Sequence, residues 1–186
     1  MWVNDISTLN PLPPAKFRQW MQKPNNLANE LRKVCNTLSV KLLSQHFDYA
    51  LEDEYAALTI EKNFLDDSKI CYIRKIFLEG DGCPFTYGRV VVPKTVYLHY
   101  QQKFDGLGTR LIGETLLYND PTTRRSAFEY QRLENNHILF KEIFSYSSII
   151  TPLPLVSSLW ARRSVFHMEG KHPLLITEVF LDSIPR

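Results

Sequence analysis

The sequence has no apolar run long enough to cross a membrane. A spanning helix needs about 20 consecutive, predominantly apolar residues, and the nearest candidate, 148–159, is interrupted by Pro152 and Pro154. The N-terminus, Met-Trp-Val-Asn-Asp-Ile, also lacks the basic start and the apolar stretch of a secretory signal. We therefore expect a soluble protein without an integral membrane segment.

Cysteine is scarce. The three cysteines, Cys35, Cys71 and Cys83, form no Cys-x-x-Cys pair, and an odd number of thiols cannot all be bridged. Without a secretory signal, this usage favours a reducing compartment and hence a cytoplasmic location. Cys71 and Cys83 fall on the two arms of an expected hairpin and can face each other across it, but packed free thiols are the favoured state.

The sequence also lacks the spacings of common metal and catalytic motifs. Its five histidines show no HxxxH, HExxH or HxH arrangement, so neither a structural nor a catalytic metal is predicted. There is no GxSxG motif, and the Gly106-Leu-Gly108 segment is too short for a phosphate-binding loop. Any chemistry should therefore use arginine and carboxylate side chains without a cofactor.

Neither sign of charge is in excess. Twenty-two Lys and Arg against 20 Asp and Glu give a formal net charge of +2, and the Arg124-Arg125 and Arg162-Arg163 pairs are isolated. Nucleic acid is therefore not an expected partner. With 44% hydrophobic residues, a chain of 186 residues can bury one substantial core. No linker is apparent, so we expect a single domain over residues 1–186.

Local patterns predict hairpins flanked by helices. Prolines introduce a short helix through Met21, and a second helix begins after Asn26 with one apolar face. The other expected elements are a strand over 38–47, an exposed connector with at most one helical turn over 52–61, a hairpin of 71–78 and 85–92 around a Gly-Asp-Gly turn, weak helices over 94–103 and 109–117, a strand over 126–133, and a second hairpin of 164–168 and 174–181. This order predicts an α+β fold with a mainly antiparallel sheet.

Three charged residues lie inside strands that otherwise look buried: Arg74, Arg89 and Glu178. Side chains alternate between the faces of a strand, so Arg74 shares a face with Ile76, and Glu178 shares one with Ile176. A charge on a core face costs several kcal/mol unless it is paired. These residues therefore indicate either a site for a small anionic molecule or a structural salt bridge, and their pattern does not decide between the two.

Two blocks of sequence resemble the chorismate pyruvate-lyase family of ubiquinone biosynthesis. The first combines Arg74-Lys-Ile-Phe-Leu78 with Tyr87-Gly-Arg-Val-Val-Val-Pro93. The second combines Trp160-Ala-Arg-Arg-Ser164 with Gly170-Lys-His-Pro-Leu-Leu-Ile-Thr-Glu-Val-Phe-Leu181. The order and spacing of these blocks match the family, and weaker similarity extends over most of the chain.

The resemblance implies a cofactor-free lyase that converts chorismate to 4-hydroxybenzoate and pyruvate, the first committed step of ubiquinone biosynthesis. It also implies a six-stranded, mainly antiparallel sheet with flanking helices, and an enclosed site beneath two flaps that retains the aromatic product. We expect the protein to be a monomer.

The resemblance also implies roles for individual residues. Arg74 would bind the ring carboxylate, Arg89 would lie beside the departing enolpyruvyl group, and Glu178 would meet the ring hydroxyl, either orienting it or acting as a base. Leu27 and Ile112 would belong to the two flaps. A further candidate is Gly88, which lets the backbone approach a ligand or marks a bulge in the strand.

One departure and one alternative remain. The segment from Glu134 to Leu159 is longer than the family pattern and is expected to form a surface helix or a lid. The alternative function is a non-catalytic module that binds small aromatic acids, because the effector domains of some transcription regulators resemble the lyase fold. Residues 1–37 are too few and insufficiently basic for the DNA-binding domain of such a regulator, which favours the enzyme.

Overall fold

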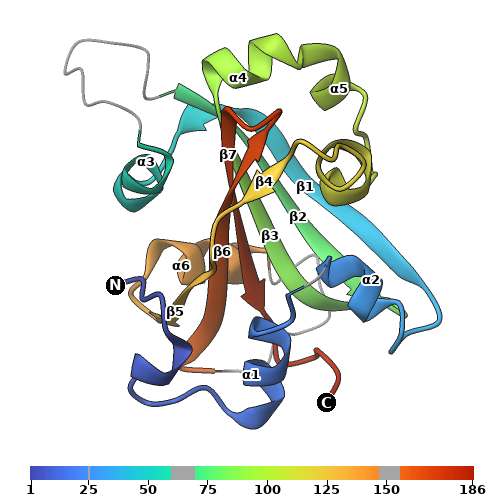
Figure 1. Cartoon of the computed structure of the whole chain (residues 1–186). Helices are drawn as coiled ribbons and strands as arrows, with labels where there is room; N and C mark the ends of the chain where they lie inside the picture. The colour runs from blue at the N-terminus through green and yellow to red at the C-terminus, as the bar shows by residue number, and fades with distance from the viewer. Residues whose placement is uncertain (25, 60–69, 147–155) are drawn as a thin grey trace.

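A curved antiparallel sheet forms the centre of the molecule in this computed structural model, which describes residues 1–24, 26–59, 70–146 and 156–186. The sheet has seven strands in the order β1-β2-β3-β7-β6-β4, with β5 also paired to β6 (Figure 1). The strands are β1 (Leu38–Tyr49), β2 (Ile70–Gly80), β3 (Cys83–Pro93), β4 (Arg124–Arg125), β5 (Glu129–Glu134), β6 (Ser158–Met168) and β7 (His172–Phe180).

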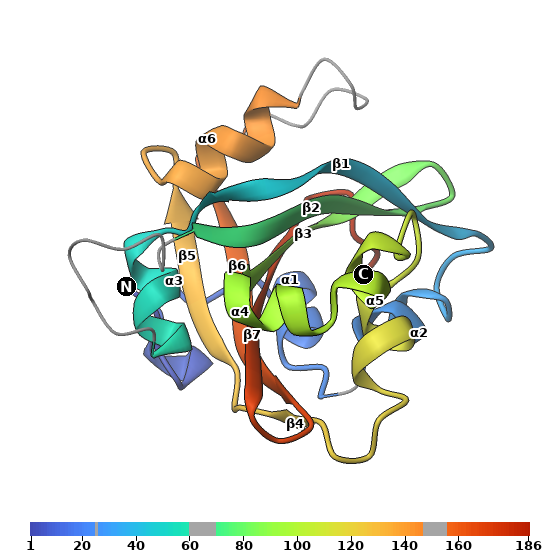
Figure 2. The same ribbon diagram turned by 90° about the horizontal axis from the view of Figure 1, so that it is seen from above.

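Short helices cover both faces of the sheet. They are the 3₁₀-helix η1 (Ile6–Thr8), α1 (Ala15–Met21), α2 (Leu27–Leu31), α3 (Glu52–Leu58), α4 (Lys94–His99), α5 (Gln101–Asp105), the π-helix η3 (Gly113–Leu117) and α6 (Ile138–Ser145). Figure 2 shows α1, α2, α4 and α5 inside the curve of the sheet and α6 outside it. In the described ranges, no helix is both long and apolar enough to cross a membrane.

The two predicted hairpins are confirmed. Strands β2 and β3 are joined through Asp81 and Gly82, whose φ angles are 49° and 80°. Strands β6 and β7 are joined through Glu169 and Gly170, with φ angles of 50° and 72°. Two successive left-handed residues suit the right-handed twist of the strands that they connect.

Alternation along the strands gives the sheet two different faces. Arg74, Ile76 and Leu78 of β2 point to the inside of the curve, which we call the concave face, together with Gly88 and Glu178 from the neighbouring strands. The opposite, convex face carries two core clusters. One contains Phe77, Tyr87, Val179 and the buried residues of α6; the other contains Ile73, Val91, Leu175 and Leu58 of α3.

The α+β class and the mainly antiparallel sheet are confirmed, but three details differ from the sequence predictions. The sheet has seven strands instead of six, one of them the two-residue β4. The expected connector over 52–61 contains the seven-residue helix α3, which is stabilised by burial of Leu58 and of the Glu54 side chain. Cysteines 35, 71 and 83 are free, as favoured, yet Cys83 is exposed instead of packed.

The long segment from Glu134 to Leu159 contributes α6, and its residues 147–155 lie outside the described part of the chain. Helix α6 buries Leu139, Phe140 and Ile143 against the convex face. Of the two alternatives from the sequence, the described part is therefore a surface helix, and it lies across the sheet from the concave face.

Candidate active site

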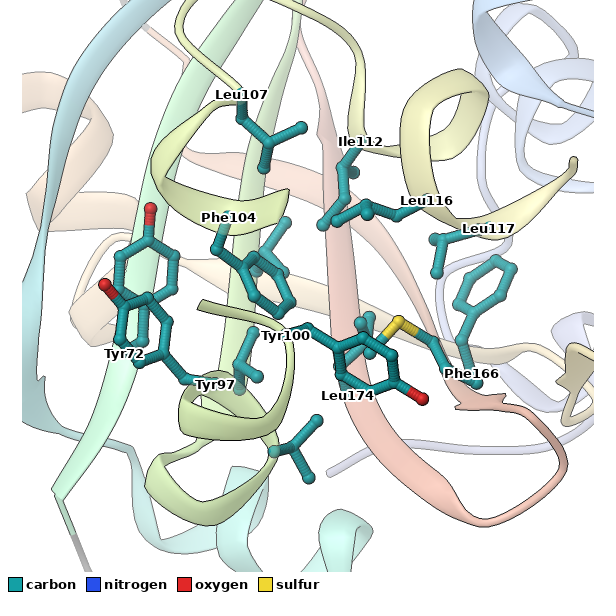
Figure 3. Packing of buried hydrophobic residues seen from close by; sticks show 14 residues of the cluster. Tyr72, Tyr97, Tyr100, Phe104, Leu107, Ile112, Leu116, Leu117, Phe166 and Leu174 are labelled. Carbon is teal, nitrogen blue, oxygen red and sulfur yellow. The ribbon is translucent and has the colours of Figure 1, made fainter. Parts of the chain in front are cut away.

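A cavity lies on the concave face, between the sheet and the covering helices. Its empty space is about 700 Å³, its opening to solvent included. Most of the lining is apolar, and Ile112, Leu117 and Phe166 from this lining are visible in Figure 3. The polar side chains of the lining are Asn26, Thr86, Tyr118, Arg125, Arg162, Ser164 and Glu178. An apolar cavity with a few convergent polar groups is the usual form of a small-molecule site.

A single row of cross-strand partners forms the floor. Ile76 of β2 pairs with Gly88 of β3, Gly88 pairs with Glu178 of β7, and Glu178 pairs with Arg162 of β6. Gly88 is the one residue of this row without a side chain. A Cβ atom at Gly88 would lie 3.0 Å from Cγ1 of Ile76, so the missing side chain leaves space directly above the sheet.

The Arg162–Glu178 pair is the main charged feature of the floor. Nε of Arg162 donates to Oε2 of Glu178 at 2.5 Å, and its Nη1 donates to the carbonyl oxygens of Met21 at 3.1 Å and Lys23 at 2.7 Å. The Arg162 side chain is 1% exposed and that of Glu178 is 20% exposed. Backbone carbonyl oxygens therefore hold the Arg162 side chain in place, and the Glu178 carboxylate is the more accessible of the two groups.

Two segments cover the cavity. One is the start of α2, where Oδ1 of Asn26 accepts from the backbone N–H of Ala28 at 3.0 Å. The other is 111–113, at the start of the π-helix η3. An ion pair between Arg32 and Glu114 joins α2 to η3, and Arg125 donates to the carbonyl oxygen of Pro24 at 2.8 Å. The Arg32–Glu114 pair therefore holds the two covering segments together, and the Arg125 bond attaches the start of α2 to β4.

Three hydroxyl groups lie in this lining, and those of Thr86 and Tyr118 are the best placed to meet a ligand. Thr86 is 1% exposed, and its Oγ1 has no hydrogen-bond partner among the described residues. An unpartnered buried hydroxyl costs free energy, so this one is available to a ligand. Burial raises the pKa of Tyr118, and the nearby Glu178 carboxylate raises it further, so this phenol stays protonated and can donate.

Arg74 lies on the concave face but is not a lining residue. Its register partner is Val90, which does line the cavity. Nη1 of Arg74 donates to Oε1 of Gln45 at 2.9 Å, and Nη2 donates to the carbonyl oxygen of Gly108 at 2.8 Å. It has no carboxylate partner in the part of the chain that the structure describes, and burial lowers its pKa. Among residues 1–24, 26–59, 70–146 and 156–186, Arg74 is thus a buried cation without a matching anion.

Arg89 lies on the convex face, because it pairs with Lys75 and not with Arg74. Its Nε and Nη2 donate to the two carboxylate oxygens of Glu54 at 2.7 and 3.1 Å, and Glu142 of α6 is 3.6 Å away. Burial acts to lower the pKa of Arg89, but these two carboxylates outweigh it and raise the pKa above its ordinary value. Arg89 therefore joins α3 and α6 to the sheet.

The structure thus brings together four of the sequence-predicted residues: Leu27, Gly88, Ile112 and Glu178 all line the cavity. Arg74 lies one row away, and Arg89 lies on the other face. Sequence reasoning missed Arg162, Arg125 and Thr86. The sequence does contain a signal for Arg162. It lies two residues from both Trp160 and Ser164 on β6, so the three side chains share one face of that strand.

Comparisons with known proteins agree on one family. A family model described as chorismate lyase matches residues 2–185. A probable chorismate pyruvate-lyase of Aromatoleum aromaticum is 30% identical over 174 residues, covering 94% of this chain and 89% of that protein. A second one, from Nitrosospira multiformis, is 27% identical over 183 residues, covering 96% of this chain and 95% of that protein.

Solved structures extend the similarity to the fold alone. The effector domain of PhnF from Mycobacterium smegmatis superposes with a TM-score of 0.54 at 10% identity, covering 86% of this chain and 91% of that one. The C-terminal domain of the histidine utilization repressor from Pseudomonas syringae pv. tomato gives a TM-score of 0.53 at 9% identity, covering 81% and 95%.

Proposed function

Because this chain belongs to the chorismate lyase family, we propose that it eliminates pyruvate from chorismate and releases 4-hydroxybenzoate, which makes it a carbon–oxygen lyase. The observation that carries the proposal is the Arg162–Glu178 pair on the floor of an otherwise apolar, covered cavity. Such a cavity suits a flat ring, and the pair supplies charge of both signs at one point.

The reaction sets out what the site must do. Chorismate carries two carboxylates, and the elimination removes the proton from the carbon that bears the hydroxyl while the neighbouring ether bond breaks. The electrons of the C–H bond complete the aromatic ring, and those of the ether bond leave with the enolpyruvate oxygen. The protein needs to hold both carboxylates, receive the proton and stabilise the departing oxygen. A site that excludes water strengthens each of these interactions.

Glu178 is the residue we assign to the proton. It is the carboxylate in the cavity lining, and it lies beside the gap that Gly88 leaves in the floor. Its hydrogen bond from Arg162 fixes the direction of the carboxylate, which a base requires. The proton and the hydroxyl are on the same carbon atom of chorismate. The Glu178 carboxylate must therefore contact that carbon whether it takes the proton or orients the hydroxyl.

The arginines of the cavity are the partners we assign to the enolpyruvyl group. Arg125 and Arg162 both line the cavity, and both stack on Phe128, each with its Cζ 4.2 Å from the ring centroid. Planar guanidinium groups bind carboxylates through two parallel hydrogen bonds. Nε and Nη1 of Arg162 already donate hydrogen bonds to described residues of the protein. Nη2 is therefore the donor that we assign to the negative charge that develops on the departing enolpyruvate oxygen.

Arg74 is the partner we propose for the ring carboxylate. A buried cation without a carboxylate partner is expensive unless a ligand supplies the anion. Arg74 also donates to the carbonyl oxygens of Gly108 and Arg110, which directly precede the covering segment 111–113. A carboxylate that binds Arg74 would replace these bonds, so entry of the ligand is coupled to movement of the cover.

Replacing Arg74 with glutamine should weaken binding of 4-hydroxybenzoate by about 10- to 150-fold, the value of a charge-assisted contact of about 1.5–3 kcal/mol. Stability should change little, because the loss of the Arg74 hydrogen bonds is offset by removal of a buried charge that has no carboxylate partner among the described residues. Calorimetry of the product and thermal melting measure the two quantities. Unchanged affinity would remove Arg74 from this role, and a large loss of stability with normal affinity would make it a structural residue.

Replacing Gly88 with alanine should also weaken product binding, by at least about tenfold. The new methyl group occupies the floor of the cavity 3.0 Å from Ile76, so either the ligand or Ile76 must shift. Titration of 4-hydroxybenzoate against this variant and against the wild type tests the prediction. Equal affinities in the two proteins would place the ligand elsewhere.

Arg89 was expected to lie beside the enolpyruvyl group, and a catalytic role for it stays an untested prediction. Its geometry supports a different proposal, in which Arg89 stabilises the convex face and Arg162 serves the substrate. The Discussion gives the experiment that separates these roles.

The direct test of the proposed function is incubation of the pure protein with chorismate. We expect 4-hydroxybenzoate, followed by its ultraviolet absorbance, and pyruvate, measured by coupled reduction, in equal amounts. The rate should be the same in excess EDTA, because we assign every step to side chains of the cavity. Loss of activity in EDTA that returns with a divalent ion would overturn the cofactor-free assignment.

The metabolic pathway, the cellular location, the oligomeric state and the absence of a nucleic-acid partner are also proposals. We infer that the product enters ubiquinone biosynthesis, that the protein is a cytoplasmic monomer, and that nucleic acid is not a partner. Restoration of ubiquinone in a bacterium without its own chorismate lyase tests the first, and light scattering tests the oligomeric state. The alternative, a non-catalytic binding module, is not favoured, because the regulator domains share only the fold at 9–10% identity.

A further inference from the structure

Three side chains from two segments that are far apart in the sequence meet at the tip of the β6–β7 hairpin. His99 ends α4, Glu169 lies in the hairpin turn, and His172 begins β7. One potential ligand atom from each lies within 4.8 Å of the other two. None of the three lines the cavity. Two imidazoles and one carboxylate are a donor set that favours zinc and similar divalent metals.

Tyr100 supports this cluster from below. Its ring is buried in the core of the concave face, as Figure 3 shows, and its hydroxyl lies 2.8 Å from Nδ1 of His172. A hydrogen bond between this hydroxyl and Nδ1 holds the ring of His172 in a fixed orientation. With Nδ1 engaged in this way, Nε2 of His172 is the nitrogen that can bind a metal.

Charged groups of both signs surround the cluster. The carboxylate of Asp120 lies near the backbone N–H of Glu169, so a second acidic group lies beside the cluster. Lys103 lies over the ring of Tyr100, with its Nζ 5.3 Å from the ring centroid, and Lys171 lies in the hairpin turn between Glu169 and His172. Because these acidic and basic groups offset each other, affinity for a metal would come from the two imidazoles and the carboxylate of the cluster itself.

We propose that His99, Glu169 and His172 bind a zinc ion at the protein surface, in a site separate from the cavity. Water would complete the coordination. Ligand atoms about 2.0–2.1 Å from a tetrahedral zinc lie roughly 3.4 Å apart, so the cluster must contract from its present separations. His99 and Glu169 are exposed and can rotate to do so. The bound ion would fasten the hairpin tip to α4, which packs against the same core as Tyr100.

Sequence spacing could not reveal this site. The five histidines match no metal motif, and the prediction of no metal rested on that test. The three ligands are contributed by a helix end and a hairpin that lie side by side only in the folded protein.

The test is titration of the full-length protein with zinc chloride by calorimetry. We expect one saturable equivalent, and a rise in melting temperature of about 5–10 °C at a free zinc concentration near 100 times the dissociation constant. The variants His99→Ala and His172→Ala should each weaken binding at least about tenfold, and Tyr100→Phe by about 10-fold, because it removes the hydroxyl that orients His172. The matched control is His46→Ala, an exposed histidine 3.6 Å from Asp48, which should bind zinc as the wild type does.

Cobalt provides a second readout that does not depend on stability, because bound Co²⁺ absorbs visible light according to its coordination geometry. No saturable binding, or equal binding in the His99→Ala and His172→Ala variants, would overturn the proposal. Zinc removal should leave chorismate turnover unchanged, and a loss of turnover would contradict the separation of the site from the cavity. The variant Glu178→Gln should bind zinc normally, so this proposal can fail or succeed independently of the proposed function.

Discussion

Replacing Glu178 with glutamine should slow single-turnover conversion of chorismate by roughly 10²- to 10⁴-fold, the usual contribution of a positioned acid or base. Glutamine has nearly the same shape and can still accept the hydrogen bond from Nε of Arg162, so the floor of the cavity should be preserved. Only the ability to take a proton is lost. Affinity for 4-hydroxybenzoate should change much less than the rate, since the product has already lost that proton.

Rapid quenching of reactions with enzyme in excess over chorismate measures this rate without interference from slow product release. The matched control is Glu129→Gln. Glu129 pairs with Arg163 across β5 and β6 at 2.8 Å, as Glu178 pairs with Arg162 across β7 and β6, but it is not part of the cavity lining. A normal rate in a folded Glu178→Gln protein would show that this carboxylate does not accept the proton.

Replacing Arg89 with methionine should destabilise the protein by about 3–5 kcal/mol, because it leaves the Glu54 carboxylate buried without its cation. The side chains of Arg89 and Glu54 are 4% and 2% exposed, so solvent screens this pair very little. For a domain of this size the loss corresponds to a fall in melting temperature of roughly 6–20 °C. Thermal melting of the variant and the wild type in the same buffer measures it.

The double variant Arg89→Met/Glu54→Gln should recover part of that stability, because the unpaired charge is gone. At a temperature where the single variant Arg89→Met is folded, the affinity of this single variant for 4-hydroxybenzoate and its single-turnover rate should match those of the wild type. A normal melting temperature with a greatly reduced rate would instead place Arg89 at the enolpyruvyl group, as the family resemblance implied.

Sequence reasoning predicted the elements whose signals are local. The Gly-Asp-Gly turn between apolar arms identified the β2–β3 hairpin, and strand alternation placed Arg74 and Glu178 on core faces. Alternation within one strand does not depend on the rest of the fold, so these inferences were available from the sequence. The same argument could have placed Arg162 on one face of β6.

The predictions that differ from the structure depend on contacts between distant segments. The face on which Arg89 lies relative to Arg74 follows from the strand register, which a bulge between Leu78 and Glu79 shifts. Helix α3 looked like a solvated acidic connector, because nothing in the sequence shows that Glu54 is buried against Arg89. The cavity itself exists only because α2 and η3 meet over the floor of the sheet.

The central claim is that the aromatic acid lies on the concave face, above Gly88 and beside Glu178. A crystal structure of the protein with 4-hydroxybenzoate tests it most directly. We predict that the ring covers Gly88, with the hydroxyl next to Glu178 and the carboxylate reaching Arg74, whose bonds to the carbonyl oxygens of Gly108 and Arg110 are then broken. Density for the ligand on the convex face near Glu54 and Arg89, with the cavity unchanged, would contradict the account.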